Sequence, residues 1–193
     1  MRYLVIFTAL VLIFCMLCSF IPAKNDMKIY DEIVRLHIIA ASDSEDDQRL
    51  KEGVRDAVLP LLSQAVEQAK NSEQAEMFLS ATLDAVRDTA ENFLRERNCD
   101  YPVAVTVSRE HYPEKTFGEV TLPAGEYTSL RILIGKAEGH NWWGVLFPQL
   151  CLGAASAKKE MKKAGFTSDQ INILTENESP KYKIKFKFLE IFS

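Results

Sequence analysis

The hydrophobic period of the chain changes from helical to strand-like near Tyr101, and this change limits the fold more than any other feature. Before it, apolar residues recur every three or four positions, as on one face of a helix: Leu50, Val54, Val58, Leu61, Leu62, Ala65 and Ala69. After it, Val103, Val105 and Val107 alternate with smaller or polar residues, as in a strand with one buried face. A helical block followed by a block of strands predicts an α+β fold.

The helical block is expected to form a hairpin that covers one face of a sheet. Ser42 and Glu45 have the spacing of a capping box, so the first helix is expected to start there. Pro60 has no N–H group to donate, and it predicts a kink in this helix. A second helix is expected from Asn71 to about Leu94, with one apolar and one charged face.

An N-terminal strand at residues 33–40 and several later strands predict a mainly antiparallel sheet. The later strands are expected over residues 101–108, 117–122 and 127–134. The turn Gly135–Gly139 is expected to close a hairpin between the last of these and a further strand that carries both tryptophans.

The chain is expected to end with a short helix and a strand. The helix is predicted over Ala154–Ala164, with Gly165 as its C-cap. In the strand, apolar residues alternate with Lys181, Lys183, Lys185 and Lys187, which predicts a solvated lysine face. Since neither repeats nor a second core are apparent, residues 33–193 are expected to form one domain.

The first residues of the chain predict export. Residues 3–21 carry no charged side chain and follow a positively charged start at Arg2. In a helix, at ~1.5 Å per residue, they span about 28 Å, close to the hydrocarbon thickness of a bilayer. Residues 1–23 are therefore expected to be a signal peptide or an N-terminal membrane anchor, which attaches the protein to the membrane through residues 3–21 if it is uncleaved. Residues 24–32 are expected to be a linker.

Both tryptophans of the chain are adjacent, Trp142 and Trp143, between Gly139 and Pro148. Adjacent residues of a strand face opposite sides of a sheet, so the two rings cannot enter the same core. One of them is expected to need a different cover, such as a loop, a partner or a ligand. The alternative is that both rings have a purely structural role and close the two ends of a small sheet.

An enzyme would need a catalytic group, and His37 is the first candidate. The strand that carries it ends shortly before Ser42 and Asp43. The three residues together imitate the nucleophile, base and acid of a hydrolase. The simpler interpretation is a structural polar cluster of Arg35, His37 and Asp43, in which Ser42 and Asp43 also cap the next helix. The sequence supplies no positive evidence for catalysis.

Motifs for a metal, a phosphate group or a nucleic acid are not found either. The sequence contains no H-E-x-x-H, no H-x-H and no C-x-x-C in the part expected to be exported. A formal charge of -4 gives no support to nucleic-acid binding. No cofactor is expected, and residues 110–112 are expected to lie in a polar loop, with His111 solvated.

The four cysteines fall into two pairs. Cys15 and Cys18 lie inside the apolar N-terminal segment and are interpreted as small hydrophobic residues. Cys99 and Cys151 lie in the part expected outside the cytoplasm, where they form one disulfide or remain as two buried thiols. Their spacing does not choose between the two.

Five segments of the chain occur in an order that resembles a known family. Their sequences are RLHIIAASDS at residues 35–44, VRDAV at 54–58, DYPV at 100–103, LPAGEY at 122–127 and GHNWWGVLFP at 139–148. Together they resemble the stage II sporulation protein R family over residues 33–152. The chain departs from the family pattern at Ala41, where relatives often have Asn, and at Gly144, where they often have Cys. The second departure leaves Cys151 without that near partner, so any bridge would need Cys99.

The resemblance implies a protein made in the forespore and exported into the space between the forespore and mother-cell membranes. There, such proteins are taken to activate the mother-cell membrane aspartic protease that processes the precursor of sigma factor E. This activity is signalling between proteins and not catalysis. The residues expected to contact the protease are those of the tryptophan segment and two neighbours: His140, Asn141, Trp142, Trp143, Tyr127 and Arg131. Alternatives are an envelope module that binds peptidoglycan sugars, and a hydrolase that uses His37 and Asp43.

Overall fold

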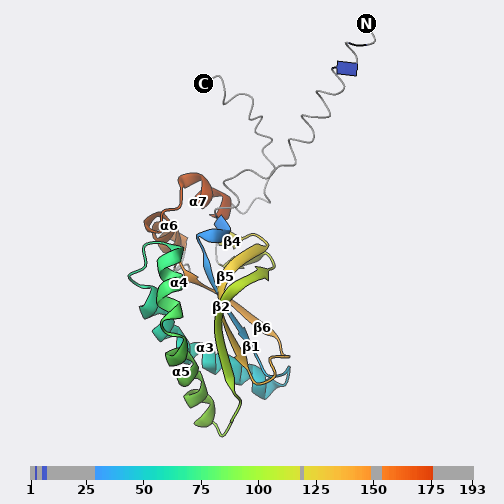
Figure 1. Ribbon diagram of the computed structural model, residues 1–193, viewed down its shortest axis with the longest axis vertical. Coiled ribbons are helices and arrows are strands. Elements are labelled where there is room, and N and C mark those ends of the chain that lie inside the picture. Colours follow the sequence, from blue (N-terminus) through green and yellow to red (C-terminus); the bar gives the residue numbers. More distant parts are fainter. Residues whose placement is uncertain (1–2, 4–5, 8–28, 118–119, 149–153, 176–193) are drawn as a thin grey trace.

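The computed structural model describes residues 3, 6–7, 29–117, 120–148 and 154–175, and it has the α+β class that the sequence predicts (Figure 1). The predicted signal peptide or anchor lies outside these residues except at positions 3 and 6–7, and the predicted lysine strand lies wholly outside them. Among the described residues, no helix combines the length and the apolar character needed to span a membrane.

The main sheet has four strands in the order β2-β5-β1-β6. Their bounds are β1 Val34–Ile39, β2 Val103–Tyr112, β5 Gly125–Ile134 and β6 Asn141–Phe147. The β2–β5 and β1–β6 pairs are antiparallel, and the β1–β5 pair is parallel. The predicted hairpin between β5 and β6 is therefore wrong, because β1 lies between these two strands. β1 is buried along almost its whole length, and a strand that is buried on both faces belongs in the centre of a sheet.

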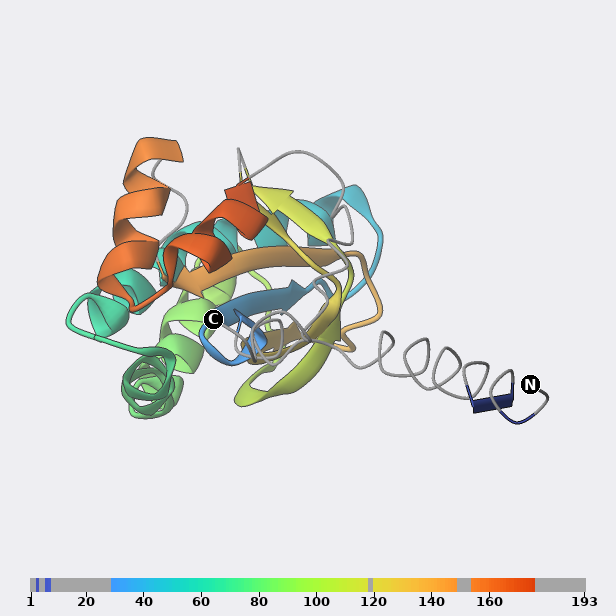
Figure 2. The same cartoon turned by 90° about the horizontal axis from the view of Figure 1, so that it is seen from above.

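The helices α3 Glu45–Val66, α4 Ser72–Ser80 and α5 Leu83–Arg95 lie together along one face of this sheet (Figures 1 and 2). α3 continues as a helix through Pro60, and its N-cap is Ser44, two residues after the predicted cap. The second predicted helix is in fact two helices. It breaks at Thr82, whose backbone leaves the helical region and whose hydroxyl donates to the carbonyl oxygen of Leu79.

The described elements cover the opposite face of the sheet at one end. The short strands β3 Lys115–Phe117 and β4 Val120–Leu122 pair with each other, where the sequence predicted a single strand. Two further helices, α6 Ala154–Lys163 and α7 Ser168–Thr175, gather at the same end (Figure 1). α6 ends before Gly165, whose φ of +92° confirms the predicted C-cap, whereas α7 was not predicted.

Each face of the sheet has its own core. On the helix side, apolar residues of β1, β5 and β6 pack against α3–α5: Leu36, Ile38, Val54, Val58, Leu62, Val86, Ala90, Leu94, Leu130, Ile132 and Leu146. A smaller core on the other face joins the sheet to β4, α6 and α7: Ile33, Tyr112, Leu122, Tyr127, Val145, Met161 and Phe166. The expectation of a single core is therefore wrong, because the C-terminal helices cover part of the second face.

Candidate functional site

The two tryptophans face opposite sides of the sheet, as strand geometry predicts, and both rings are half-buried. Trp142 packs against the helix-side core, with the guanidinium carbon of Arg55 5.4 Å from its ring centre. Trp143 lies on the other side, stacked on His37 at a centroid distance of 3.9 Å. Each ring therefore has partners within the fold and also keeps some exposed surface.

A chain of polar contacts surrounds His37 on the face that carries Trp143. Both carboxylate oxygens of Glu110 lie 3.2 Å from Nδ1 of His37, and Nε2 lies 3.0 Å from Oδ1 of Asn141. Nε of Arg131 lies 2.8 Å from Oε1 of Glu110. This one carboxylate therefore serves two cationic or titratable side chains, from β1 and β5.

Strand register explains why these residues meet. His37 is opposite Arg131 on β5 and Trp143 on β6, so the three side chains form a row across the same face. Glu110 comes from β2, which continues through the residues expected to be a polar loop. Its role was missed because the buried positions change face along β2: Val103, Val105 and Val107 pack on the helix side, whereas Glu110 and Tyr112 face the other side.

Arg35 lies one row further along the same face and is fully buried. Its Nε donates to the carbonyl oxygen of Gly144 at 3.1 Å, and its guanidinium carbon lies 4.1 Å from the ring centre of Tyr112 and 5.1 Å from that of Tyr127. Burial away from water lowers the pKa of Arg35 from its usual value. In the described part of the chain, its Nη1 and Nη2 atoms have no hydrogen-bond partner.

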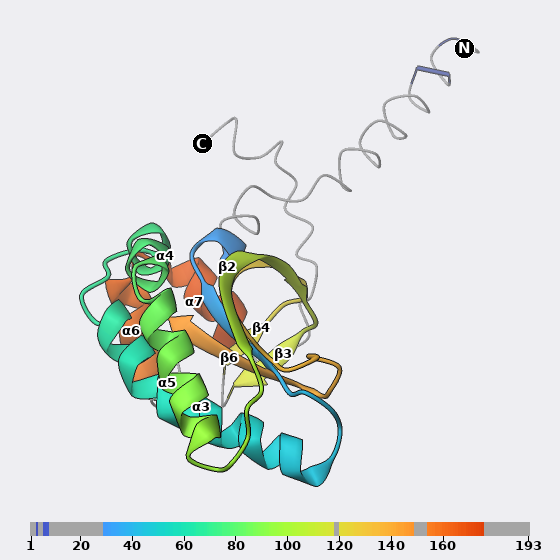
Figure 3. The ribbon, with the colours of Figure 1, turned by 60° about the horizontal axis from the view of Figure 1, so that its bottom comes forward.

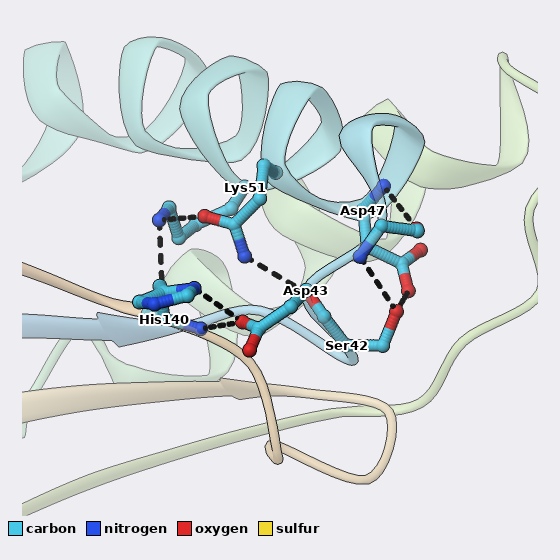
Figure 4. Close-up of polar contacts among 7 residues, drawn as sticks. Ser42, Asp43, Asp47, Lys51 and His140 are labelled. Atoms are coloured by element: carbon cyan, nitrogen blue, oxygen red, sulfur yellow. Dashed lines mark hydrogen bonds and ion pairs between the residues drawn. The ribbon is translucent and has the colours of Figure 1, made fainter.

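The predicted polar cluster of Arg35, His37 and Asp43 is not formed. Asp43 instead binds His140, whose backbone nitrogen lies 2.6 Å from Oδ1 and whose Nδ1 lies 2.5 Å from the same oxygen (Figure 4). The reason is that β1 ends before Asp43, which turns towards the start of α3 and the loop that enters β6.

Further bonds hold the same loop. Lys51 donates to the carbonyl oxygen of His140 at 3.0 Å, and burial lowers the pKa of this lysine (Figure 4). The backbone nitrogen of Gly139 donates to the carbonyl oxygen of Ala40 at 3.0 Å. Gly139 has no room for a Cβ atom, which would meet the backbone of Ser42. The tryptophan strand is thus attached at its first residues to the start of α3.

The hydrolase alternative loses its geometric basis among these contacts. Ser42 donates its hydroxyl proton to Asp47 Oδ2 at 2.5 Å, as Figure 4 shows, and His37 has Glu110 as its carboxylate partner. Ser42, His37 and Asp43 therefore each have a different partner, and a nucleophile–base pair needs the serine and the histidine within hydrogen-bond reach.

Tyr127 does not lie on a contact surface. It is fully buried, and its hydroxyl donates to the carbonyl oxygen of Pro123 at 2.6 Å. β3–β4 and the second core cover this end of the face. The prediction that Tyr127 contacts a partner is therefore corrected, whereas His140 and Asn141 are exposed and Arg131 is half-exposed.

The end of this face that no described helix or further strand covers is called the open face. It consists of two rows of side chains, exposed or half-buried, from all four strands: Ile39, Ala104, Thr106, Arg131, Leu133, Asn141 and Trp143. Figure 3 brings this end of the sheet forward. In that view α3 and α5 lie together on one side of β1 and β6, which is the helix side. The open face mixes apolar surface with outward-facing polar groups, as protein contact surfaces do.

Metal and thiol chemistry adds little to this site. Within the described residues, no group of three or more His, Cys, Asp or Glu side chains is placed to hold a metal ion. Cys99 is half-buried, and it forms no disulfide with another described residue. Cys151 lies outside the described residues, so the predicted disulfide stays a prediction.

Comparison with known proteins places these features in a family. Residues 30–157 match the stage II sporulation protein R family. The chain is also 34% identical over 141 residues to stage II sporulation protein R of Bacillus subtilis (strain 168), a match that covers 70% of this chain and 63% of that relative. No solved structure matches the chain. The matched region holds β1 to β6 with the whole open face, and the chain belongs to the stage II sporulation protein R family.

Proposed function

We propose that this chain is an exported, non-enzymatic signalling protein of endospore formation. In this proposal it crosses the forespore membrane and remains, secreted or anchored, in the space between forespore and mother cell. There it activates the mother-cell membrane aspartic protease that processes the precursor of sigma factor E. The observation that carries the proposal is the open face, on which half-exposed Trp143 stands beside exposed Asn141 and half-exposed Arg131.

The contacts of the polar groups support a binding role over a catalytic one. His37 has both ring nitrogens in hydrogen bonds, to Glu110 and Asn141, and it is almost fully buried. A general base needs a free nitrogen within reach of a substrate proton. The network is better suited to fix the orientation of Asn141 and Trp143 on a rigid sheet.

Rigid presentation is useful for an activator. A partner that binds one protease state more tightly than another shifts the equilibrium by that difference in affinity, and no chemistry is needed. Tryptophan and arginine are the residues that most often supply such binding energy. The open face holds one of each. The contacts of the β6 loop with the start of α3 hold the strand that carries Trp143, and Glu110 pairs with Arg131.

The test compares the two tryptophans, which are both half-buried and differ in the face of the sheet that they occupy. In sporulating cells that carry Trp143→Leu, precursor processing on an immunoblot is expected to be lost. Trp142→Leu, on the helix side, should lose a similar amount of stability, about 1–3 kcal/mol, and should still process. Both variants must accumulate to the level of the parent protein. Normal processing with Trp143→Leu would contradict the proposal.

One observation also favours the peptidoglycan alternative. A half-exposed indole beside an exposed amide, such as Trp143 with Asn141, offers a stacking surface and a hydrogen-bond donor to a sugar ring. Pull-down of the full chain with isolated sacculi distinguishes the two functions. Retention that depends on Trp143 would favour the envelope module, whereas no retention together with lost processing favours docking on the protease.

A further inference from the structure

The helix α6 carries a positively charged surface that plays no part in the open face. Ala157 and Met161, one helical turn apart, pack in the second core. The chain as a whole has a formal charge of -4, so positive charge on one helix is a local feature. The outward side of α6, called the α6 basic face, consists of exposed lysines: Lys158, Lys159, Lys162 and Lys163.

The spacing of these lysines works against the helix. Lys158 and Lys162 are four residues apart. Lys159 and Lys163 repeat this spacing, and like charges four residues apart on a helix repel each other. One ion pair offsets the repulsion, since Nζ of Lys163 lies 2.7 Å from Oε1 of Glu160. Lysines in the last turn also interact favourably with the helix dipole, but Lys158 and Lys159 lie before that turn. The stability of α6 therefore does not account for the pattern.

The basic residues of the other helices are balanced by acidic neighbours. On α3, Arg49 pairs with Asp46 at 2.5 Å. On α5, Arg87 pairs with Asp84 at 2.9 Å. On α6, by contrast, none of the acidic groups that the structure describes pairs with the three lysines other than Lys163. A surface with unbalanced positive charge is complementary to an anionic surface.

α6 lies at the end of the domain that follows the predicted anchor. Ile29, which packs with Met161 and Phe166 in the second core, comes eight residues after Ile21, the last residue of the apolar segment. A stretch of this length spans at most about 29 Å, so an anchored chain holds this end of the domain near the bilayer. Figure 1 shows α6 and α7 together at this end, and in Figure 2, which looks onto it, α6 lies lengthwise across the view.

We infer that the α6 basic face binds the anionic lipid headgroups of the membrane in which residues 3–21 are anchored. The inference goes beyond the activation of the protease, and it rests on the proposed function for the anchor alone. Lysine clusters beside an apolar anchor bind anionic lipid, and each lysine strengthens this binding about fivefold. β1 begins next to Ile33 in the second core and ends at Ile39 on the open face. Contact through α6 therefore turns the open face away from the anchoring membrane.

The first experiment measures the reactivity of lysines in the full chain within a membrane. The chain is placed in nanodiscs of phosphatidylcholine, or of phosphatidylcholine mixed equally with phosphatidylglycerol, and acetylation of each lysine is followed by mass spectrometry. Lys158, Lys159 and Lys162 are expected to react about fivefold more slowly in the anionic discs, because headgroups cover them, and high salt should remove this difference. The control is Lys136, which is exposed in the turn after β5 at the open-face end and should react equally in both discs.

Two results of this experiment overturn the inference. One is an equal rate in both discs for the α6 lysines, which is also the result expected if an acidic protein or a wall polymer is the true partner. The other is equal slowing at Lys136, which would mean that the membrane has no preferred side of the domain. If the chain does not enter neutral discs, the anchor fails, and the inference is then decided by retention on anionic discs, whose absence overturns it.

The second experiment replaces two lysines and uses Lys162 as the reporter. Lys158→Gln/Lys159→Gln should bring the rate of Lys162 in anionic discs close to its rate in neutral discs. Lys158→Arg/Lys159→Arg keeps the charge and should keep Lys162 slow. Arg87→Gln/Arg95→Gln removes the same charge from exposed positions of α5 and should leave Lys162 slow as well. A slow Lys162 in the Gln variant of α6 overturns the inference, whereas the activation of the protease is tested separately on the open face.

Discussion

Arg35 places a positive charge inside the fold with little to neutralise it. Its guanidinium lies against the rings of Tyr112 and Tyr127, and one of its nitrogens donates to a backbone carbonyl. Cation–π contacts offset part of the desolvation cost, but two nitrogens remain unpaired in the described part of the chain. The volume of the side chain therefore contributes more to stability than its charge.

Two substitutions separate volume from charge at this position. Arg35→Met keeps an unbranched side chain between the rings, so the free energy of unfolding is expected to change by less than about 1 kcal/mol. Arg35→Ala leaves a cavity and should lose about 3 kcal/mol. Urea unfolding of the full chain in mild detergent, followed by circular dichroism, measures both. Equal losses in the two variants would mean that the charge itself holds the rings together.

The partner of His37 shows where residue-level prediction ends. Alternation along β1 correctly placed Arg35 and His37 on one face, and adjacency correctly separated Trp142 from Trp143. The carboxylate of His37 was sought nearby in sequence, at Asp43, but it comes from Glu110, 73 residues away. That contact depends on β2 and β5 pairing in one particular register, and a single sequence with local patterns does not contain this information.

At the level of elements, the order of the strands decides the site. The turn at residues 135–139 has hairpin composition, and yet β6 passes β5 and pairs with β1. Local turn signals favour pairing between sequence neighbours, whereas burial of an apolar strand on both faces favours a central position for β1. Here burial prevails, and the loop before β6 is attached to the start of α3 by Asp43 and Lys51.

Removal of the Asp43 contact should loosen the first residues of β6. In Asp43→Ala, backbone amides at residues 140–143 are expected to exchange with solvent about fivefold faster, since a charged hydrogen bond of about 1 kcal/mol is lost at an exposed site. Asp46→Ala is the matched control, because Asp46 is exposed in the same region and pairs with Arg49. Hydrogen exchange measured by mass spectrometry distinguishes them. Unchanged exchange in Asp43→Ala would show that Lys51 and Gly139 hold the loop alone.

For the whole molecule, the second core has a chemical character of its own. Its centre holds the phenols of Tyr112 and Tyr127, both fully buried, and burial raises the pKa of each above the usual 10.0. Tyr112 shares a hydrogen bond with Ser129 at 2.5 Å. The two tyrosines join the covered end of the sheet to β4 and to the C-terminal helices, so the ionisation of the phenols is coupled to the stability of the entire domain.

This coupling predicts a loss of stability in alkaline solution. Below pH 10 both phenols are protonated in the folded and in the unfolded chain, and their contribution is fully present. Above pH 10 the unfolded chain releases these protons first, so the folded state binds more protons, and stability falls by about 1.4 kcal/mol per pH unit for each tyrosine. Lys51 and Arg35 act in the opposite direction, because burial lowers the pKa of each of these side chains.

The double variant Tyr112→Phe/Tyr127→Phe isolates the contribution of the phenols. It should be less stable than the parent near pH 8, because the hydrogen bonds to Ser129 and Pro123 are lost at a cost of about 1 kcal/mol each. Between about pH 10 and about pH 11, however, its urea midpoint should fall less steeply than that of the parent, since no buried phenol remains to hold a proton. Parallel curves for the two proteins would place the alkaline sensitivity elsewhere and would contradict the burial of these hydroxyls in solution.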